Sequence, residues 1–356
     1  MKLPALQIGD LIAKLPIIQG AMGVGVSLSG LAGAVANEGG IGVISAVQIG
    51  FKESDFETNT LEANLRALKQ EIRKARVISP KGIIGVNLMV AMNNYAKITK
   101  AALEEGVDII ISGAGLPMAL PGIVEGYKTK IAPIVSSGRA AAVICKMWDK
   151  RHNRVPDLVV VEGPDAGGHL GYSKEELLSG DGQKLDEILV EVIKEVKIYG
   201  DKYGVVIPVV AAGGIYTGKD IAKYMKLGAA GVQMATRFIG TVECDADIKF
   251  KEAFISAKKE DIQIVVSPVG MPGRAIRNKH IVDLEKGPIK VTKCFNCLKP
   301  CNPAETPYCI SKALIEAVKG NVNEGLIFTG TNGYRIEKIV TVKEIINELV
   351  TEAEAD

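Results

Sequence analysis

The chain reads Val206-Ile-Pro-Val-Val-Ala-Ala-Gly-Gly-Ile215, then a helical segment at Asp220–Lys226, then Gly231-Val-Gln-Met-Ala-Thr-Arg237. Each apolar run is followed by small residues, and the first run ends in a glycine pair. Strands of a parallel sheet are typically apolar throughout, because helices cover both faces of the sheet. This stretch therefore predicts a strand, a helix and a second parallel strand, with a loop suited to ligand contact after each strand.

The same alternation extends toward the N-terminus. Eight apolar runs within about 235 residues fit a (β/α)8 TIM barrel, and an open doubly wound sheet is the alternative. That alternative predicts a Gly-x-Gly-x-x-Gly opening, which the region Gly20–Gly25 does not supply cleanly. The expected strands are Pro16–Gln19, Ile41–Ser45, Ile83–Asn87, Ile109–Ser112, Ala132–Ser136, Leu158–Glu162, Val206–Ala211 and Gly231–Met234, and the expected helices include Leu61–Ala75, Asn94–Glu105, Arg139–Lys150, Leu185–Tyr199 and Asp220–Lys226.

The pattern changes after about Thr241. We expect residues 1–240 to form the barrel and residues 241–356 to form a smaller C-terminal extension packed on it. The extension contains helical patterns at Lys249–Lys259, Ile310–Lys319 and Val342–Glu352, with a cysteine cluster between the first two.

Composition and charge exclude several classes of protein. Of 356 residues, 47% are hydrophobic and 24% charged, which argues against a disordered chain, a collagen or a coiled coil. The net charge is 43 − 41 = +2, so we expect no nucleic-acid partner. No apolar stretch approaches the ~20 residues of a membrane helix, and the first ten residues lack a signal-peptide pattern. We therefore expect a cytoplasmic protein without a membrane partner.

The expected strand ends carry small and amide-bearing residues. The loops after the last two strands, Ala212–Ile215 and Ala235–Thr236, resemble a phosphate site, because glycines allow backbone N–H groups to converge on an anion. Phosphate sites are frequent at this position of the fold. The alternative is that these glycines only make tight turns.

One histidine lies in a strand-end loop, Val161-Glu-Gly-Pro-Asp-Ala-Gly-Gly-His169. Histidine can accept or donate a proton near neutral pH, so His169 is the candidate acid/base. His152 is expected at the surface, and His280 either at the surface or at the rim of the substrate site.

The cysteine cluster has the spacing Cys-x2-Cys-x3-Cys-x7-Cys, formed by Cys294, Cys297, Cys301 and Cys309. Closely spaced cysteines with nearby prolines are more typical of a [4Fe–4S] site than of two separated zinc knuckles. Zinc and free thiols remain alternatives. The isolated Cys145 and Cys244 are expected in the core or in loops.

Taken together, the strand-end motifs resemble the nitronate monooxygenase and enoyl-ACP reductase II superfamily of FMN barrels. The resemblance rests on Gln19–Met22, Gly85–Met89, Glu162–His169, Ala211–Ile215 and Gly231–Arg237, in order over about residues 10–240. The cysteine cluster, with Ser267–Ile276 and Phe328–Arg335, is similar to a narrower branch, the FabX-type acyl-ACP dehydrogenase/isomerases, which hold FMN and a [4Fe–4S] cluster.

This resemblance implies roles for individual residues. It places Ala21 and Met22 against the flavin, and Asn87 on its ring or ribityl chain. It also implies that Glu162 orients the ribityl hydroxyls or the loop, with His169 as the catalytic acid/base. The remaining FMN contacts are Gly167 and Gly168 near the flavin and Gly213, Gly214, Ala235 and Thr236 at its phosphate; the cluster ligands are Cys294, Cys297, Cys301 and Cys309.

The implied reaction is oxidation of a fatty acyl thioester: His169 takes the α-proton and the flavin takes a β-hydride. Double-bond isomerisation, or enoyl reduction with NAD(P)H in the reverse direction, would use the same site. The implied partner is acyl carrier protein, with Arg274, Arg277 and Lys279 as candidate docking residues, and we expect a homodimer. The alternatives are a nitronate monooxygenase and a non-catalytic flavin/iron–sulfur electron carrier.

Overall fold

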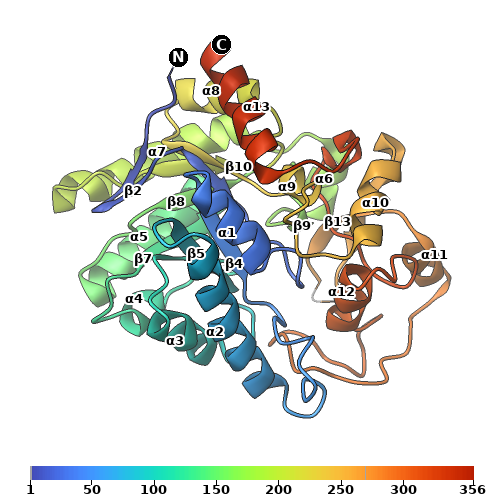
Figure 1. The fold of residues 1–356 in the computed structure, drawn as a ribbon. Helices are drawn as coiled ribbons and strands as arrows, with labels where there is room; N and C mark the ends of the chain where they lie inside the picture. Colours follow the sequence, from blue (N-terminus) through green and yellow to red (C-terminus); the bar gives the residue numbers. More distant parts are fainter. Residues whose placement is uncertain (1, 269) are drawn as a thin grey trace.

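The computed structural model describes residues 2–268 and 270–356, and its centre is a closed parallel barrel (Figure 1). The strand order around the barrel is β10-β11-β3-β4-β5-β6-β7-β8. The protein is therefore a (β/α)8 TIM barrel, as predicted, and the open-sheet alternative is wrong. The strands are β3 (Ile17–Gln19), β4 (Ile41–Ser45), β5 (Ile83–Met89), β6 (Ile109–Gly113), β7 (Lys130–Val135), β8 (Val159–Glu162), β10 (Val209–Ala212) and β11 (Gly231–Met234).

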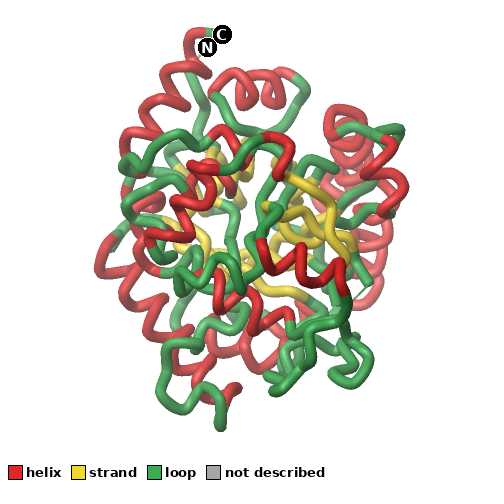
Figure 2. The backbone as a smooth tube through the Cα atoms, turned by 90° about the vertical axis from the view of Figure 1, so that its right-hand side faces the viewer, coloured by secondary structure: helices red, strands yellow, loops and turns green. Residues whose placement is uncertain are grey.

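Helices surround the barrel on its outer face (Figure 2). Their buried sides carry aliphatic residues that pack on the outward side chains of the strands, as amphipathic helices do. These helices are α1 (Ser29–Asn37), α2 (Thr60–Ile78), α3 (Tyr95–Glu104), α4 (Leu120–Ile123), α5 (Gly138–His152), α7 (Leu185–Tyr203), α8 (Gly218–Lys226) and α9 (Thr236–Ile239). The short helix α6 (Lys174–Ser179), in the loop after β8, has no buried residue and contacts β12 (Ile262–Val266) instead.

A short hairpin closes the N-terminal end of the barrel. It consists of β1 (Leu6–Ile8) and β2 (Leu11–Ala13), paired antiparallel. Its buried side chains belong to the same apolar cluster as Ile18, Val43 and Val160 inside the barrel. The filled interior and this plug leave the C-terminal strand ends as the open end, where sites form in this fold.

The last helix, α13 (Val342–Ala355), packs against α8 and α1. The contact with α8 is close at Gly218, where a Cβ atom would lie 2.5 Å from the backbone nitrogen of Ala353. Gly218 N–H also donates a hydrogen bond to Glu352 Oε2 (2.7 Å). Residues of the extension thus complete the helical layer of the barrel, and the division at residue 240 stays a prediction.

The remaining extension lies beside the open end of the barrel (Figure 1). Its strand β13 pairs antiparallel with β12 and with β9 (Gly168–His169), a two-residue strand in the loop after β8. This three-stranded sheet is absent from the sequence-based expectation. The extension contains α10 (Ile248–Ser256), η1 (Lys259–Asp261), β12 (Ile262–Val266), β13 (Pro272–Ile276), α11 (Lys279–Lys286), α12 (Ile310–Val318) and η2 (Gly333–Arg335).

Within residues 2–268 and 270–356, no helix is both long and apolar enough to cross a membrane.

Candidate functional site

A cavity of about 260 Å³ lies at the C-terminal ends of the barrel strands. Loops after β3, β5, β8, β10 and β11 form its walls, together with residues 326–332 of the extension. The structure therefore brings together the residues predicted as catalytic or cofactor-binding, although they are up to 215 positions apart in sequence. Those lining the cavity are Ala21, Met22, Asn87, Glu162, Gly167, Gly168, His169, Gly213, Gly214, Ala235 and Thr236.

One end of this cavity is a cradle of backbone N–H groups. Gly213 and Gly214 have φ angles of +98° and +76°, which L-residues with a side chain rarely adopt. Among the described residues, no acceptor bonds the backbone N–H of Gly213, Gly214, Ala235 or Thr236. Converging N–H groups of this kind favour an anion.

The extension closes over this cradle from outside. Gly330 N–H donates to Thr236 Oγ1 (3.0 Å), and Asn332 Nδ2 donates to Gly214 O (2.7 Å). Gly167 lies so near this segment that a Cβ atom would be 2.6 Å from Gly330 N. The glycine at position 167 is thus required for a close backbone approach.

His169 lies on β9, opposite Gly273 of β13. Its Nε2 is 2.7 Å from Ser267 Oγ, and its ring meets that of Phe328 edge to face at 5.2 Å between centroids. Burial lowers the pKa of His169 to about 4, because an apolar environment disfavours the charged form. The imidazole is therefore neutral at pH 7 and can accept a proton.

Glu162 ends β8 and lines the same cavity. Burial raises the pKa of its carboxyl group to about 7. Its backbone oxygen accepts a hydrogen bond from Tyr172 Oη (2.6 Å). A carboxyl group near half-protonation can donate to or accept from a polar ligand.

The prediction that Arg274 is a docking residue at the surface is wrong. Instead of lying on a docking surface, it is only 7% exposed, and its guanidinium donates to the backbone oxygens of Pro164 (2.9 Å) and Ala166. It therefore holds the loop that precedes His169. Arg277 and Lys279 are surface residues paired with Glu285 and Asp283.

The other two histidines lie away from the first cavity. His152 is exposed, as predicted. His280 is 6% exposed and packs edge to face on Tyr308 (5.3 Å between ring centroids), so the prediction of a surface or rim position is wrong. Its pKa is lowered by burial.

A second cavity of about 270 Å³ adjoins the first. The two cavities share Val47, Met89, His169 and Leu314 as lining residues. His169 thus stands at the junction. Cys294 and Cys297 line the second cavity together with neighbours from the same segment.

The four clustered cysteines lie near one another, since Cys294, Cys301 and Cys309 each raise the pKa of Cys297 after the larger effect of burial. In the part of the chain that the structure describes, no three His, Cys, Asp or Glu side chains are placed so that they could hold one metal ion. The geometry thus does not support the predicted cluster. Cys145 and Cys244 are buried in the core, as predicted.

Several residues that line the site were not assigned a role from sequence. Gln233, Phe328 and Asn332 line the first cavity, and Ser267 contacts His169. The motifs Ser267–Ile276 and Phe328–Arg335 signalled their segments, but not their contacts. Val269 of the first motif lies outside the described residues.

Comparison with known proteins gives consistent matches. Residues 7–352 match the family described as "Nitronate monooxygenase". A "(3aS,4S,5R,7aS)-5-hydroxy-7a-methyl-1-oxo-octahydro-1H-indene-4-carboxyl-CoA dehydrogenase" of Mycobacterium tuberculosis is 26% identical over 272 residues, which cover 76% of this chain and 66% of that protein. A "Probable nitronate monooxygenase" of Staphylococcus haemolyticus is 29% identical over 305 residues, 77% of this chain and 78% of that protein. The structure of FabK from Thermotoga maritima superposes with a TM-score of 0.72 at 25% identity, covering 96% of this chain and 94% of that one.

Proposed function

The chain belongs to the nitronate monooxygenase family, and from this membership and the geometry of the first cavity we propose that it is an FMN-dependent oxidoreductase of fatty acyl thioesters. The observation that carries the proposal is a half-buried His169, held neutral by desolvation, in a cavity whose other end is an anion cradle. A proton acceptor and an anchored redox cofactor are the two parts that oxidation next to an acidic carbon requires.

The residues present fit FMN. The N–H groups of Gly213, Gly214, Ala235 and Thr236 suit its phosphate. Small residues along the walls, among them Ala21, Gly167 and Gly168, leave room for a large flat ring system. In this proposal Met22 packs on the flavin, and Asn87 and Glu162 bond its polar edge or its ribityl chain.

When bound, FMN supplies a two-electron acceptor for a hydride from the β-carbon of the acyl chain. His169 takes the α-proton, which the neighbouring thioester carbonyl makes acidic. Ser267 Oγ lies within hydrogen-bonding distance of Nε2 (2.7 Å) and holds the ring in its orientation. Phe328 of the extension packs edge to face on the imidazole and covers that side of the ring.

The choice of an acyl thioester is supported by the matched dehydrogenase, whose name specifies a carboxyl-CoA compound. The FabX-type assignment rests on the cysteine spacing and the two C-terminal motifs. No step of the proposed reaction is assigned to a cluster. An acyl carrier protein partner, NAD(P)H use, the reaction direction and a homodimer stay predictions.

Nitronate oxidation is the second candidate, favoured by the family match. A nitronate is also a reactive carbon beside an electron sink, and His169 could serve it equally. An electron carrier without catalysis is disfavoured, because a carrier has no use for a buried base.

An anaerobic absorbance titration tests the proposal. Decanoyl-ACP is added to the FMN-loaded protein in one cuvette and a nitronate in another, each beside the His169→Ala variant. We expect the acyl thioester to bleach the flavin band in the wild type and not in the variant. Bleaching by the nitronate alone would favour the second candidate, and undiminished bleaching in the variant would remove His169 as the base.

A further inference from the structure

The second cavity differs in chemistry from the first. Its deep wall carries Gln48, Asn64 and Ser311, each less than 9% exposed. Its outer part is lined by further amide and hydroxyl side chains, Thr58, Thr60, Asn93, Asn94 and Asn296. We propose that this cavity binds the phosphopantetheine arm of the acyl thioester, with the thioester group held at His169. The inference rests on the proposed function and adds to it the mode of substrate recognition.

The deep amides form a connected network. Asn64 Nδ2 donates to Gln48 Oε1 (2.9 Å), and Gln48 Nε2 donates to Ser311 Oγ (3.3 Å). Each of these amides has donor and acceptor capacity beyond those bonds. A fatty chain here would cover polar groups without pairing them, which is costly. Pantetheine carries two amides and hydroxyl groups, and so offers partners of both kinds.

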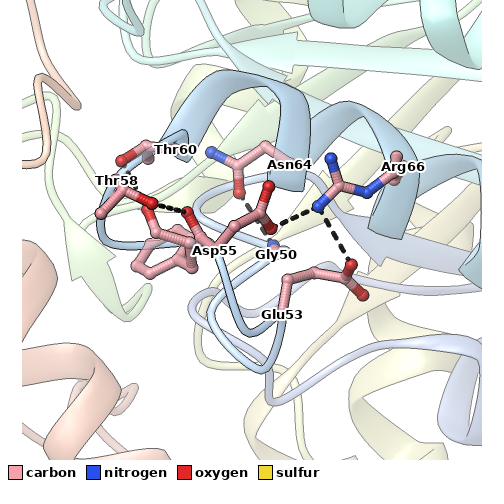
Figure 3. Close-up of polar contacts among 8 residues, drawn as sticks. Gly50, Glu53, Asp55, Thr58, Thr60, Asn64 and Arg66 are labelled. Carbon is pink, nitrogen blue, oxygen red and sulfur yellow. Dashed lines mark hydrogen bonds and ion pairs between the residues drawn. The ribbon is translucent and has the colours of Figure 1, made fainter.

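The wall of the second cavity is held in place by α2 (Figure 3). Asn64 Oδ1 accepts from Gly50 N–H (2.8 Å), and Arg66 pairs with Glu53 (3.3 Å) and Asp55. These contacts fix the segment from Gly50 to Thr60, whose last residues, Glu57, Thr58 and Thr60, line the cavity. A preformed wall lowers the entropy cost of binding a flexible arm.

Lysine side chains lie close to the outer rim of this cavity. Glu57, which lines it, is paired with Lys293 (2.9 Å). The pKa of the Glu57 carboxyl is lowered by that lysine, and further by Lys319 and Lys312 on or beside α12. Three lysines around one carboxylate leave a positive excess, which suits the phosphate at the far end of the arm or an acidic carrier protein.

The first cavity supplies the complementary apolar part. Beyond His169 it is lined by Val24, Val26, Ile239, Phe250 and Leu326. A fatty acyl chain would pack there, beneath the extension. The thioester joins an apolar chain to an amide-bearing arm. His169 likewise lies between this apolar part of the first cavity and the second cavity, whose wall combines the amides with apolar side chains such as Leu61 and Met92.

The test compares two thioesters of the same acyl group: decanoyl-pantetheine, with the full arm, and decanoyl-N-acetylcysteamine, a truncated analogue. Leu61→Trp fills the second cavity, since Leu61 lines it. Leu65→Trp is the matched control, because Leu65 is also a half-buried leucine of α2 but lines neither cavity. Asn93→Leu is a second variant, which removes an amide at the outer part without adding an aromatic ring.

In the FMN-loaded wild type we expect kcat/KM for anaerobic flavin reduction to be at least tenfold higher with decanoyl-pantetheine. Leu61→Trp and Asn93→Leu should abolish that preference by lowering kcat/KM for decanoyl-pantetheine to about the value for the truncated thioester. Leu65→Trp should retain the preference. Calorimetric binding of the unreactive thioether S-decyl-pantetheine should weaken in the same two variants.

Equal rates for both thioesters, or equal losses in Leu61→Trp and Leu65→Trp, would overturn the inference and leave the proposed function standing. If a nitronate reduces the flavin and none of the acyl thioesters does, the proposed function itself is wrong. Decanoyl-CoA and decanoyl-ACP distinguish the two natural sources of the arm. The charge-reversing variant Lys312→Glu should reduce kcat/KM for decanoyl-CoA or decanoyl-ACP, depending on which of the two the lysines near the rim recognise. Decanoyl-pantetheine has no phosphate and serves as the control substrate.

Discussion

Burial of His169 predicts a measurable cost to folding in acid. The pKa of this side chain is about 4 in the folded protein and about 6.5 when unfolded. Between these values the unfolded chain binds a proton that the folded protein excludes, so stability falls as the pH drops from about 6.5 to about 4. At 1.36 kcal/mol per pKa unit, the loss from pH 7 to pH 5 is about 2 kcal/mol.

Glu162 acts in the opposite direction. Its pKa is about 7 in the folded protein and near 4.3 in an unfolded chain. Here the folded protein binds the proton first, so this group adds stability as the pH falls from about 7, also by about 2 kcal/mol at pH 5. The two effects nearly cancel, and the pH profile of the wild type alone is uninformative.

The informative quantity is therefore a difference between variants. Urea unfolding of the cofactor-free protein is measured at pH 7 and pH 5 for the wild type, His169→Gln and the exposed-site control His152→Gln. When the pH is lowered from 7 to 5, the wild type loses about 2 kcal/mol of unfolding free energy because of His169, and His169→Gln does not. The change in unfolding free energy of the variant should therefore be about 2 kcal/mol more stabilising than that of the wild type. His152→Gln should behave as the wild type. If all three proteins respond equally, His169 is not held neutral by burial, and the argument for it as a base at pH 7 loses its physical basis.

Three further predictions concern the surroundings of the site. Gly214→Ala should weaken FMN binding roughly tenfold in a fluorescence titration of the cofactor-free protein, since φ is +76° and the new Cβ would lie 2.8 Å from the Asp165 Cβ, a strain of about 1–2 kcal/mol; unchanged affinity would place the cofactor phosphate elsewhere. Arg274→Met should lower the free energy of unfolding by about 2–4 kcal/mol in urea, because two buried carbonyl oxygens lose a charged donor; a loss below 0.5 kcal/mol would show that the loop before His169 is held by other contacts. Cys145 and Cys244 should stay unmodified by iodoacetamide at pH 8 in the native protein, as read by mass spectrometry, because burial raises their thiol pKa values to about 12 and about 11; rapid labelling would show that the core opens.

The barrel is predictable from sequence because its signals are local. Runs such as Ile41–Ser45 and Gly231–Met234 match β4 and β11 to the residue. The strand that contains Val210 begins later than expected, at Val209, since Val206 is 89% exposed and precedes Pro208. A proline lacks the N–H that a ladder needs.

Helix α1 is harder to recognise from its residues. Its sequence, Ser-Gly-Leu-Ala-Gly-Ala-Val-Ala-Asn, has two glycines and no charged face. Small side chains are needed here, because a Cβ on Gly33 would lie 2.8 Å from that of Ile78. Because α1 packs closely against its neighbours, it is built from small residues and lacks the amphipathic pattern on which helix prediction depends.

Some residues of the site are predictable from the sequence and others are not. Strand-end residues such as Gly213 and Glu162 follow from topology alone, because parallel strands end at one edge. The contacts that complete the site do not: β9 has two residues and pairs with β13 about 100 positions away. No local pattern signals such a pairing, and the depth at which Arg274 and His280 lie follows from it and from tertiary packing.

The pairing of β9 with β13 also limits how this enzyme could be recombined. Since His169, the proposed proton acceptor, lies on a strand that is paired with the extension, we expect that the barrel and the extension cannot be exchanged independently between homologues. A chimaera that takes its barrel from one parent and residues 262–276 from another brings together two strands that were selected separately, at the position of the proposed base, His169. Crossovers placed outside both segments, so that the loop after β8 and the β12–β13 hairpin are inherited from one parent, should preserve turnover in the hybrids, whereas crossovers between them should yield folded barrels with impaired proton transfer.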